Sequence, residues 1–248
     1  EDFTSDARAI SRLKREAKLA GTLQHPGIPA VHDIGESDGL HYFAMDFVEA
    51  APLSRVLDAL RELGHDAVDG ATIGGTVVRY RHRPLAAAAD TVALPSFWQR
   101  SPVQIMVDLA IQVLWALEAA HACRVIHRDV KPANILVRID GAAVLTDFGL
   151  AREEGMLGMT ATGDFAGTPH YASPEQATAR PTDLDARTDV FALGATLYEM
   201  LTLARAFGGA TVSEIRSKVE HHDPRAPARC DSRIPPDLSA IVMRALEK

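Results

Sequence analysis

The segment DVFALGATLYEMLT, residues 189–202, is apolar on nearly every side of a helix. A helix with that pattern is buried all round rather than along a single stripe. It needs other elements packed on every side, which predicts a sizeable helical lobe built around it. The chain has enough material for such a lobe, because 47% of its 248 residues are hydrophobic. A chain of this length forms one large domain or two small ones.

Three other stretches have helical patterns. The sequence SPVQ at 101–104 has the form of an N-cap, a helix-starting proline and a capping-box partner, and apolar residues continue at three- and four-residue steps to about His121. Residues 5–24 have a similar periodicity, which ends at HPG. Residues 235–248 predict one more amphipathic helix.

Strands are expected in two places. β-branched and aromatic residues on both sides of ESDG, at 36–39, predict a β-hairpin, and short strands are expected at ILV and AVLTDF. Residues 61–100 are rich in Gly, Ala and Pro without sustained periodicity, so we interpret them as a long insertion. The order of helix, small sheet, insertion and mostly helical lobe predicts an α+β fold with two unequal lobes.

Charge and cysteine content exclude some classes of function. A formal net charge of -7 provides no basic field for a phosphate backbone, so no nucleic-acid partner is expected. Cys123 and Cys230 form neither a disulfide framework nor a CxxC zinc site, which favours a reducing, cytoplasmic location. No run of about 18 uncharged apolar residues and no signal peptide are present, so no membrane segment is expected in this chain. It lacks an initiator Met and ends in a helical pattern, so we expect a piece of a longer protein, whose membrane tether and homodimer formation stay open.

The stretch RVIHRDVKPANILV, residues 124–137, places costly polar groups in a segment flanked by aliphatic residues. Asp129, Lys131 and Asn134 lie within six residues, and DFG follows at 147–149 after a stretch of hairpin length. One interpretation is that both motifs are turns, in which Asp is favoured. In this order, however, they match the signature of protein kinases. The chain resembles a serine/threonine protein kinase, and bacterial members of that family look most similar.

The resemblance implies a protein-kinase-like bilobal fold and a set of catalytic roles. Residues 1–50 would form a truncated small N-lobe and hinge, with one helix and short antiparallel strands, and residues 51–248 a mostly helical C-lobe with the insertion at 61–100. The cofactors would be ATP and Mg²⁺, and the partners would be protein substrates with Ser/Thr hydroxyls. The carboxylate of the HRD motif, Asp129, would be the catalytic base, and Lys131 would place positive charge on the γ-phosphate.

Metal and nucleotide would be held by further residues, again as the resemblance implies. Asn134 and Asp147 would supply oxygen ligands to magnesium. YFAMDFVEA resembles the hinge that receives adenine, with Met45 as gatekeeper and backbone groups from Asp46 and Val48. Leu136 would pack under the adenine ring. Glu16 would pair with the lysine of the third strand, and without the resemblance it would be an ordinary exposed helical charge.

The Gly- and Thr-rich stretch after DFG resembles the activation segment of kinases, and it ends in SPE where the family usually has APE. Arg128 would pair with a phosphate on Thr160 or Thr162, although these threonines could be turn formers only. Thr168 in GTPHY lies where serine/threonine members bind the catalytic Asp and Lys. Together with Lys131 it favours Ser/Thr over Tyr substrates.

Some features of the resemblance leave alternatives open. Asp189 matches the position that braces the catalytic loop, or is an ordinary helix N-cap. The chain has no Gly-rich phosphate loop and no VAIK lysine, and GATIGG at 70–75 lacks the spacing of that loop. We therefore expect this chain alone to be inactive or slow, and a pseudokinase or truncated non-catalytic scaffold is the alternative function. A small-molecule phosphotransferase is disfavoured by the peptide-docking segment GTPHYASPE.

Overall fold

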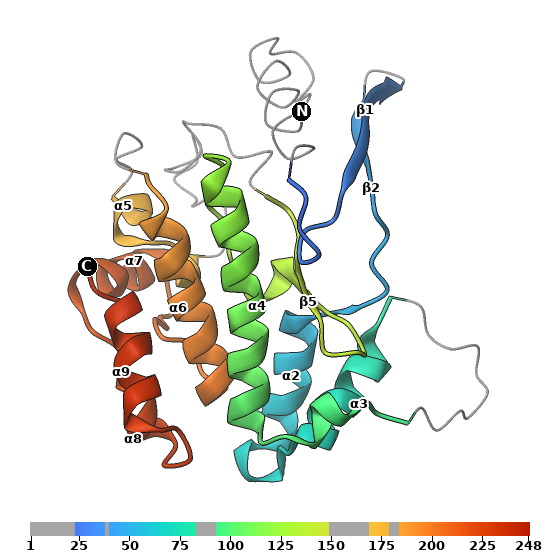
Figure 1. Ribbon diagram of the computed structural model, residues 1–248. Coiled ribbons are helices and arrows are strands. Elements are labelled where there is room, and N and C mark those ends of the chain that lie inside the picture. The colour runs from blue at the N-terminus through green and yellow to red at the C-terminus, as the bar shows by residue number, and fades with distance from the viewer. Residues whose placement is uncertain (1–22, 38–39, 83–92, 149–168, 179–183) are drawn as a thin grey trace.

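A computed structural model describes residues 23–37, 40–82, 93–148, 169–178 and 184–248. β1 (Val31–Ser37) and β2 (Leu40–Met45) pair antiparallel, which confirms the hairpin predicted around ESDG. This hairpin projects from the helical part of the molecule (Figure 1). The helix predicted at 5–24 lies, except for its last two residues, outside the described residues.

A second, smaller sheet joins the segment after β2 to the middle of the chain. Its antiparallel strands are β3 (Ala51–Pro52), β4 (Ile135–Val137) and β5 (Ala143–Leu145), in the order β3-β4-β5. The two strands predicted at ILV and AVLTDF are therefore confirmed. The backbone N–H of Leu145 donates to the carbonyl of Gly27 at 2.8 Å, which attaches the HPG turn to β5.

Helices make up most of the regular secondary structure of the described chain (Figure 1). They are α2 (Leu53–Leu63), α3 (Gly70–Tyr80), α4 (Pro102–Ala122), α5 (Pro174–Ala177), α6 (Arg187–Thr202), α7 (Val212–His221), α8 (Pro227–Cys230) and α9 (Pro236–Ala245). Short 3₁₀ turns lie at His65–Ala67, Ser96–Gln99, Pro132–Asn134 and Pro169–Tyr171. α9 confirms the helix predicted for residues 235–248.

α6 is the central helix, as its all-round apolar pattern predicts. Thirteen of its 16 residues are buried. It packs between α4 on one side and α9 on the other (Figure 1). The helices approach closely at Gly194, where an added Cβ would lie 2.8 Å from Cβ of Ala245. The core of the helical lobe is thus organised around residues 187–202.

α4 begins as the capping-box sequence predicts. The side chain of Ser101 accepts from the backbone N–H of Gln104 at 3.3 Å, and the side chain of Gln104 accepts from the N–H of Ser101 at 3.2 Å. The inward face of α4 packs on α6 and β5. By length and composition alone, α4 is also long and apolar enough to cross a membrane, and 44% of that window is buried inside the molecule.

Residues 61–100, interpreted as a long insertion without sustained periodicity, contain a regular helix, α3, that the sequence pattern does not indicate. Ile73 and Val77 of this helix are buried in the core, and its N-cap, Asp69, accepts from the N–H of Thr72 at 2.7 Å. The three glycines of GATIGGTVVRY lower intrinsic helix propensity and hide the periodicity. Two of them lie under Trp98, whose buried ring and backbone leave no space for a Cβ.

Candidate active site

The loop of the HRD motif is held in place by a fully buried carboxylate. Asp189 of α6 accepts the backbone N–H of Arg128 at 2.7 Å and that of His127 at 2.8 Å. A third contact, at 2.7 Å, comes from Nε2 of His121 in α4. The N-cap of α6 is Ala186, so Asp189 is not the N-cap but braces the loop. The carboxylate therefore fixes the backbone immediately before Asp129.

His127 is buried and neutral. Its Nε2 lies 2.9 Å from the carbonyl of Thr146, and its Nδ1 accepts the N–H of Asp129 at 3.2 Å, so the proton is on Nε2. Burial lowers the pKa of His127, against the opposing charge of Asp189. The ring also contacts Phe148 of DFG, with centroids 4.5 Å apart. His127 thus links the HRD loop to the DFG segment by two independent contacts.

Asp129, Lys131 and Asn134 form one hydrogen-bonded cluster. Nζ of Lys131 donates to Oδ2 of Asp129 at 2.8 Å, and Nδ2 of Asn134 donates to the same oxygen at 3.2 Å and to the backbone carbonyl of Asp129 at 2.9 Å. The side chains of Asp129 and Lys131 are 20% and 18% exposed. The carboxylate is therefore pre-oriented and still accessible to a substrate.

The DFG aspartate lies next to this cluster. The N–H of Thr146 donates to the carbonyl of Asn134 at 2.9 Å, so Asp147 follows directly on a residue bound to Asn134. Both Asp147 and Arg128 have left-handed backbone angles, with φ of 57° and 66°. For residues other than glycine, such angles cost about 1–3 kcal/mol and persist only where surrounding contacts impose them.

The predicted hinge has its own network. The N–H of Asp46 donates to the carbonyl of Ala30 at 2.9 Å, and the Asp46 carboxylate accepts from the Ala30 N–H and contacts His32. The hydrogen bond from His32 is the main reason why the pKa of Asp46 is lowered. Within the described part of the chain, the carbonyl of Asp46 and the N–H of Val48 make no backbone hydrogen bond.

The sheet brings the hinge segment towards the catalytic cluster. Leu136, half-buried in β4, pairs with Pro52 of β3, which directly follows the hinge. Met45, at the end of β2, is 40% exposed. A hollow of about 600 Å³ borders the hinge and is lined by Asp46, Val48 and Arg138 among others, but not by the residues of the Asp129 cluster.

Two contacts that anchor the SPE segment and the residue after it were not predicted from the sequence. Nε2 of Gln176 donates to the carbonyl of Arg128 at 2.8 Å, and Oγ1 of Thr188 donates to Glu175 at 2.5 Å. Gln176 is also the capping-box partner of Ser173 at the start of α5. The spacing S-x-x-Q in SPEQ is the signal that could have identified this helix start. Nothing in the sequence marks Thr188 as the partner of Glu175.

A buried ionic network also escaped prediction. Glu199 of α6 accepts the hydroxyl of Tyr171 at 2.5 Å and pairs with the guanidinium of Arg61 in α2. Burial raises the pKa of Tyr171. The network ties the end of the predicted activation segment to two helices of the core. Glu16, Thr160, Thr162 and Thr168 lie outside the described residues, and no metal cluster of three or more His, Cys, Asp or Glu occurs among the residues that are described.

A buried brace, a partly exposed carboxylate with a lysine and an asparagine, and an adjacent DFG aspartate are the arrangement that the kinase signature in the sequence predicts. The chain matches the family model of the protein kinase domain over residues 94–246, and it belongs to that family. It also matches the model of the phosphotransferase enzyme family over residues 3–153.

Individual relatives are bacterial serine/threonine kinases. The chain is 35% identical over 253 residues to serine/threonine-protein kinase PknB of Mycolicibacterium smegmatis, covering 100% of this chain and 34% of the relative. It is 33% identical over 251 residues to serine/threonine-protein kinase PkaA of Streptomyces coelicolor, covering 100% of this chain and 38% of the relative. The chain thus spans about a third of the length of the curated relatives it matches.

A solved structure shares the fold. Residues 1–466 of Rad53, crystallised in complex with AMP-PNP, match with a TM-score of 0.66 at 21% identity, over 97% of this chain and 51% of that chain. The predicted α+β, kinase-like fold with a mostly helical C-lobe is therefore confirmed. The division into residues 1–50 and 51–248 stays a prediction.

Proposed function

We propose that this chain is the catalytic part of a serine/threonine protein kinase, which transfers the γ-phosphate of ATP to Ser/Thr hydroxyls of protein substrates. The observation that carries the proposal is the Asp129 carboxylate, bound by Lys131 and Asn134 on a loop that Asp189 braces. Similarity to curated serine/threonine kinases over the whole chain supports the substrate class.

Asp129 would accept a hydrogen bond from the substrate hydroxyl and take its proton late in the transfer. The N–H of Asp129 donates to Nδ1 of His127, so the backbone of Asp129 is held in place as well as its carboxylate. Lys131, now on Oδ2 of Asp129, has three donors and a flexible stem. It would lie close enough to stabilise negative charge on the transferred phosphate.

The residues present fit a magnesium ion bound together with phosphate oxygens. Asn134 turns its Nδ2 to Asp129, which leaves its amide oxygen for a cation, and Asp147 follows the residue that bonds to Asn134. Amide and carboxylate oxygens are hard ligands, and magnesium commonly takes only one or two carboxylates and completes its shell with water and phosphate. When bound, the ion would neutralise phosphate charge.

We place the adenine of ATP at the hinge, between Leu136 and the backbone of residues 46–48, with Met45 as gatekeeper and Glu16 as partner of a lysine. The carbonyl of Asp46 and the N–H of Val48, which make no backbone hydrogen bond among the described residues, support this placement.

We also assign Arg128, Thr160, Thr162 and Thr168 to control of the activation segment. We also infer a cytoplasmic location, because Cys123 and Cys230 fit no disulfide framework and therefore favour a reducing compartment.

A small-molecule phosphotransferase is the second candidate, because residues 3–153 match the phosphotransferase enzyme family. The acceptor distinguishes the two functions. A protein kinase needs a surface that docks an extended peptide, and the 3₁₀ turn at Pro169–Tyr171, anchored through Tyr171 to Glu199, is suited to that role.

The test is transfer of labelled γ-phosphate from Mg-ATP to a generic basic protein and to a panel of small hydroxyl compounds. It compares this chain, a chimera that adds a Gly-rich loop and a strand-three lysine segment to its N-terminus, and Asp129→Asn in each. We expect protein labelling by the chimera, lost on Asp129→Asn, with little by the 248-residue chain. Labelling of small compounds only would favour the second candidate. Folded protein without any transfer would favour a non-catalytic scaffold.

A further inference from the structure

The outward face of α4 carries an apolar seam that the proposed kinase chemistry does not use. Successive outward-facing positions follow steps of four and three residues, and they are Gln104, Asp108, Ile111, Trp115, Glu118 and Ala122. Alternating steps of three and four are the spacing of a helix that packs along another helix. Yet Ile111 is 38% and Trp115 56% exposed, so no element of the described chain covers them.

The seam has an exposed aromatic ring with depressions beside it. Trp115 lies between two shallow hollows and lines both of them. One hollow, of about 560 Å³, lies towards α6 and includes Leu114 and Val190. The other, of about 430 Å³, lies towards the HPG turn and includes Ile111. An exposed indole beside hollows of this size is complementary to a second copy of the same surface, as a two-fold interface requires.

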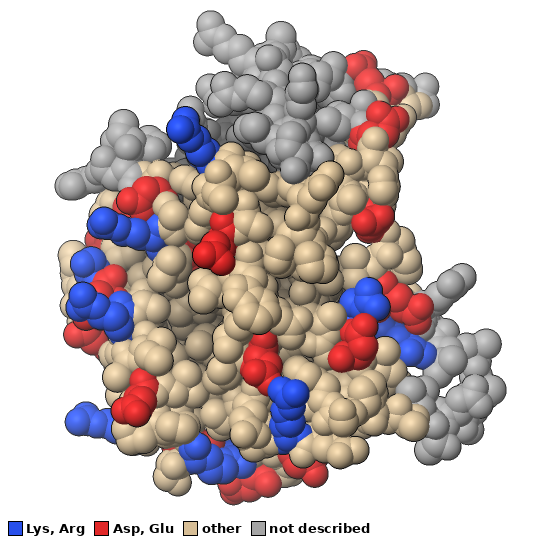
Figure 2. All heavy atoms as spheres, viewed as in Figure 1, with Lys and Arg blue, Asp and Glu red and all other residues tan. Residues whose placement is uncertain are grey.

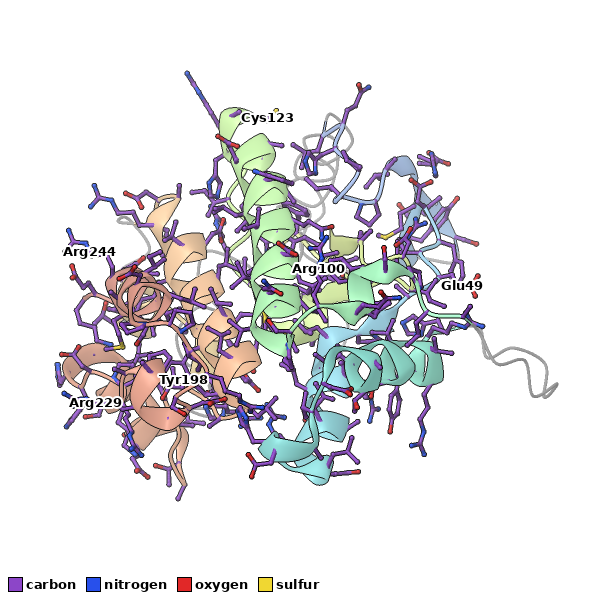
Figure 3. All side chains as sticks on the ribbon, turned by 60° about the horizontal axis from the view of Figure 1, so that its bottom comes forward. Glu49, Arg100, Cys123, Tyr198, Arg229 and Arg244 are labelled. Atoms are coloured by element: carbon purple, nitrogen blue, oxygen red, sulfur yellow. The ribbon has the colours of Figure 1, made fainter. Side chains whose placement is uncertain are left out.

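Charges on the seam are sparse and arranged at its two ends. In Figure 2 the middle of the face over α4 is largely uncharged. Arg100, which lies alongside α4 in Figure 3, pairs with Asp108 and keeps half of its side chain exposed. Towards the other end Glu118 is exposed and makes no ion pair with the described residues. One end thus carries an ion pair whose arginine is half exposed, and the other end an exposed carboxylate.

We propose that the outward face of α4 is a contact between two copies of this chain, with the two α4 helices antiparallel about a two-fold axis near Val113. In that register Ile111 lies against the partner's Trp115, and the reverse contact forms at the same time. Arg100, held beside Asp108, then meets the partner's Glu118 at both ends. The inference stands independently of the catalytic proposal.

A lipid surface fits this face less well. A helix that lies in a membrane interface turns one apolar face to lipid and a polar, usually basic, face to water. Here the opposite face of α4 is buried in the protein core, and the seam carries Asp108 and Glu118 at the depth that lipid tails would occupy. A second protein copy supplies an arginine for Glu118, whereas Asp108 already pairs with Arg100 of its own chain.

Sedimentation equilibrium of the purified chain tests the proposal. We expect a monomer–dimer equilibrium in which Trp115→Ala raises the dissociation constant at least about 30-fold, because buried aromatic residues dominate such interfaces. Ile241→Ala, which truncates another exposed apolar residue, on α9, is the matched control and should leave the constant unchanged. Circular dichroism of each variant checks that the fold is retained.

Exchanging the charges tests the register. Arg100→Glu alone should be monomeric, since its homodimer would bring only carboxylates together at both ends. Glu118→Arg is the complementary change, because it places a cation opposite the carboxylates of its partner. An equimolar mixture of the two variants should form a heterodimer, because each end again pairs opposite charges. A monomeric wild-type chain at high concentration, or a dimer that Trp115→Ala leaves unchanged, would overturn the proposal. A dimer weakened by Trp115→Ala but not restored by mixing would overturn the register.

Discussion

At the scale of single residues, the most consequential side chain of the site is one that no substrate touches. Asp189 is fully buried, and its two oxygens accept two backbone N–H groups and a contact from His121. A charged acceptor that serves several donors is worth more than a neutral hydrogen bond. Its removal leaves each of those donors without a partner in the protein interior.

Asp189→Asn therefore tests the brace. The amide keeps the shape but presents an NH₂ group to a backbone N–H, so we expect the free energy of unfolding in urea to fall by about 3 kcal/mol. Asp66→Asn makes the same chemical change at an exposed position and should alter stability by less than about 0.5 kcal/mol. An unchanged urea midpoint for Asp189→Asn would show that the loop does not depend on this carboxylate.

At the scale of elements, α3 shows why glycine content misled the sequence interpretation. A Cβ on Gly70 would overlap the backbone carbonyl oxygens of Trp98 and Arg100, whereas a Cβ on Gly75 would have nothing within 4 Å. The first glycine is required by close packing. The second is an exposed residue that costs helix stability and provides no contact in return.

The two glycines should respond oppositely to alanine. Gly70→Ala is expected to lower the free energy of unfolding by about 1–3 kcal/mol, since backbone atoms must move to admit the methyl group. Gly75→Ala is expected to raise it by about 0.5–1 kcal/mol. Thermal and urea unfolding of the two variants measures this, and equal effects of the same sign would contradict the packing seen under Trp98.

Elements with strong local signals were predicted, and contacts between distant segments were not. The caps and periodicity of α4, the all-round apolar pattern of α6 and the turn between β1 and β2 are local features, and all three elements are present. The proximity of Asp129, Lys131 and Asn134 was likewise predicted, because the three lie within six residues of one another. The contact between Arg61 and Glu199 was not, because the two residues are 138 positions apart and their proximity results from the packing of α2 on the core.

At the scale of the whole molecule, two histidines in separate places, one buried and one half-buried, make stability depend on pH. Burial lowers the pKa of both His127 and His170 below the ordinary value of 6.5. In the unfolded chain they titrate near that value. Below it the unfolded state binds more protons than the folded state, so the free energy of unfolding falls as the pH is lowered through this range. Carboxylates such as Asp46, whose pKa is lowered from 3.8, change the free energy of unfolding only at more acidic pH.

Urea unfolding at pH 7.5 and 5.5 should therefore show a less stable protein at the lower pH. His170→Gln should reduce the difference in stability between the two pH values, because it removes one of the two groups whose pKa is lowered. The matched change His222→Gln, at an exposed position, should leave the difference as it is. Equal stability at the two pH values would mean that these rings accept protons in the folded state.

The left-handed backbone at Arg128 and Asp147 has a consequence for how the sequence changes during evolution. Glycine at either position would adopt this backbone without the strain. We therefore expect the charged side chains to be retained for their role at the site. In lineages of this chain that give up phosphate transfer, positions 128 and 147 should be among the first to drift to glycine.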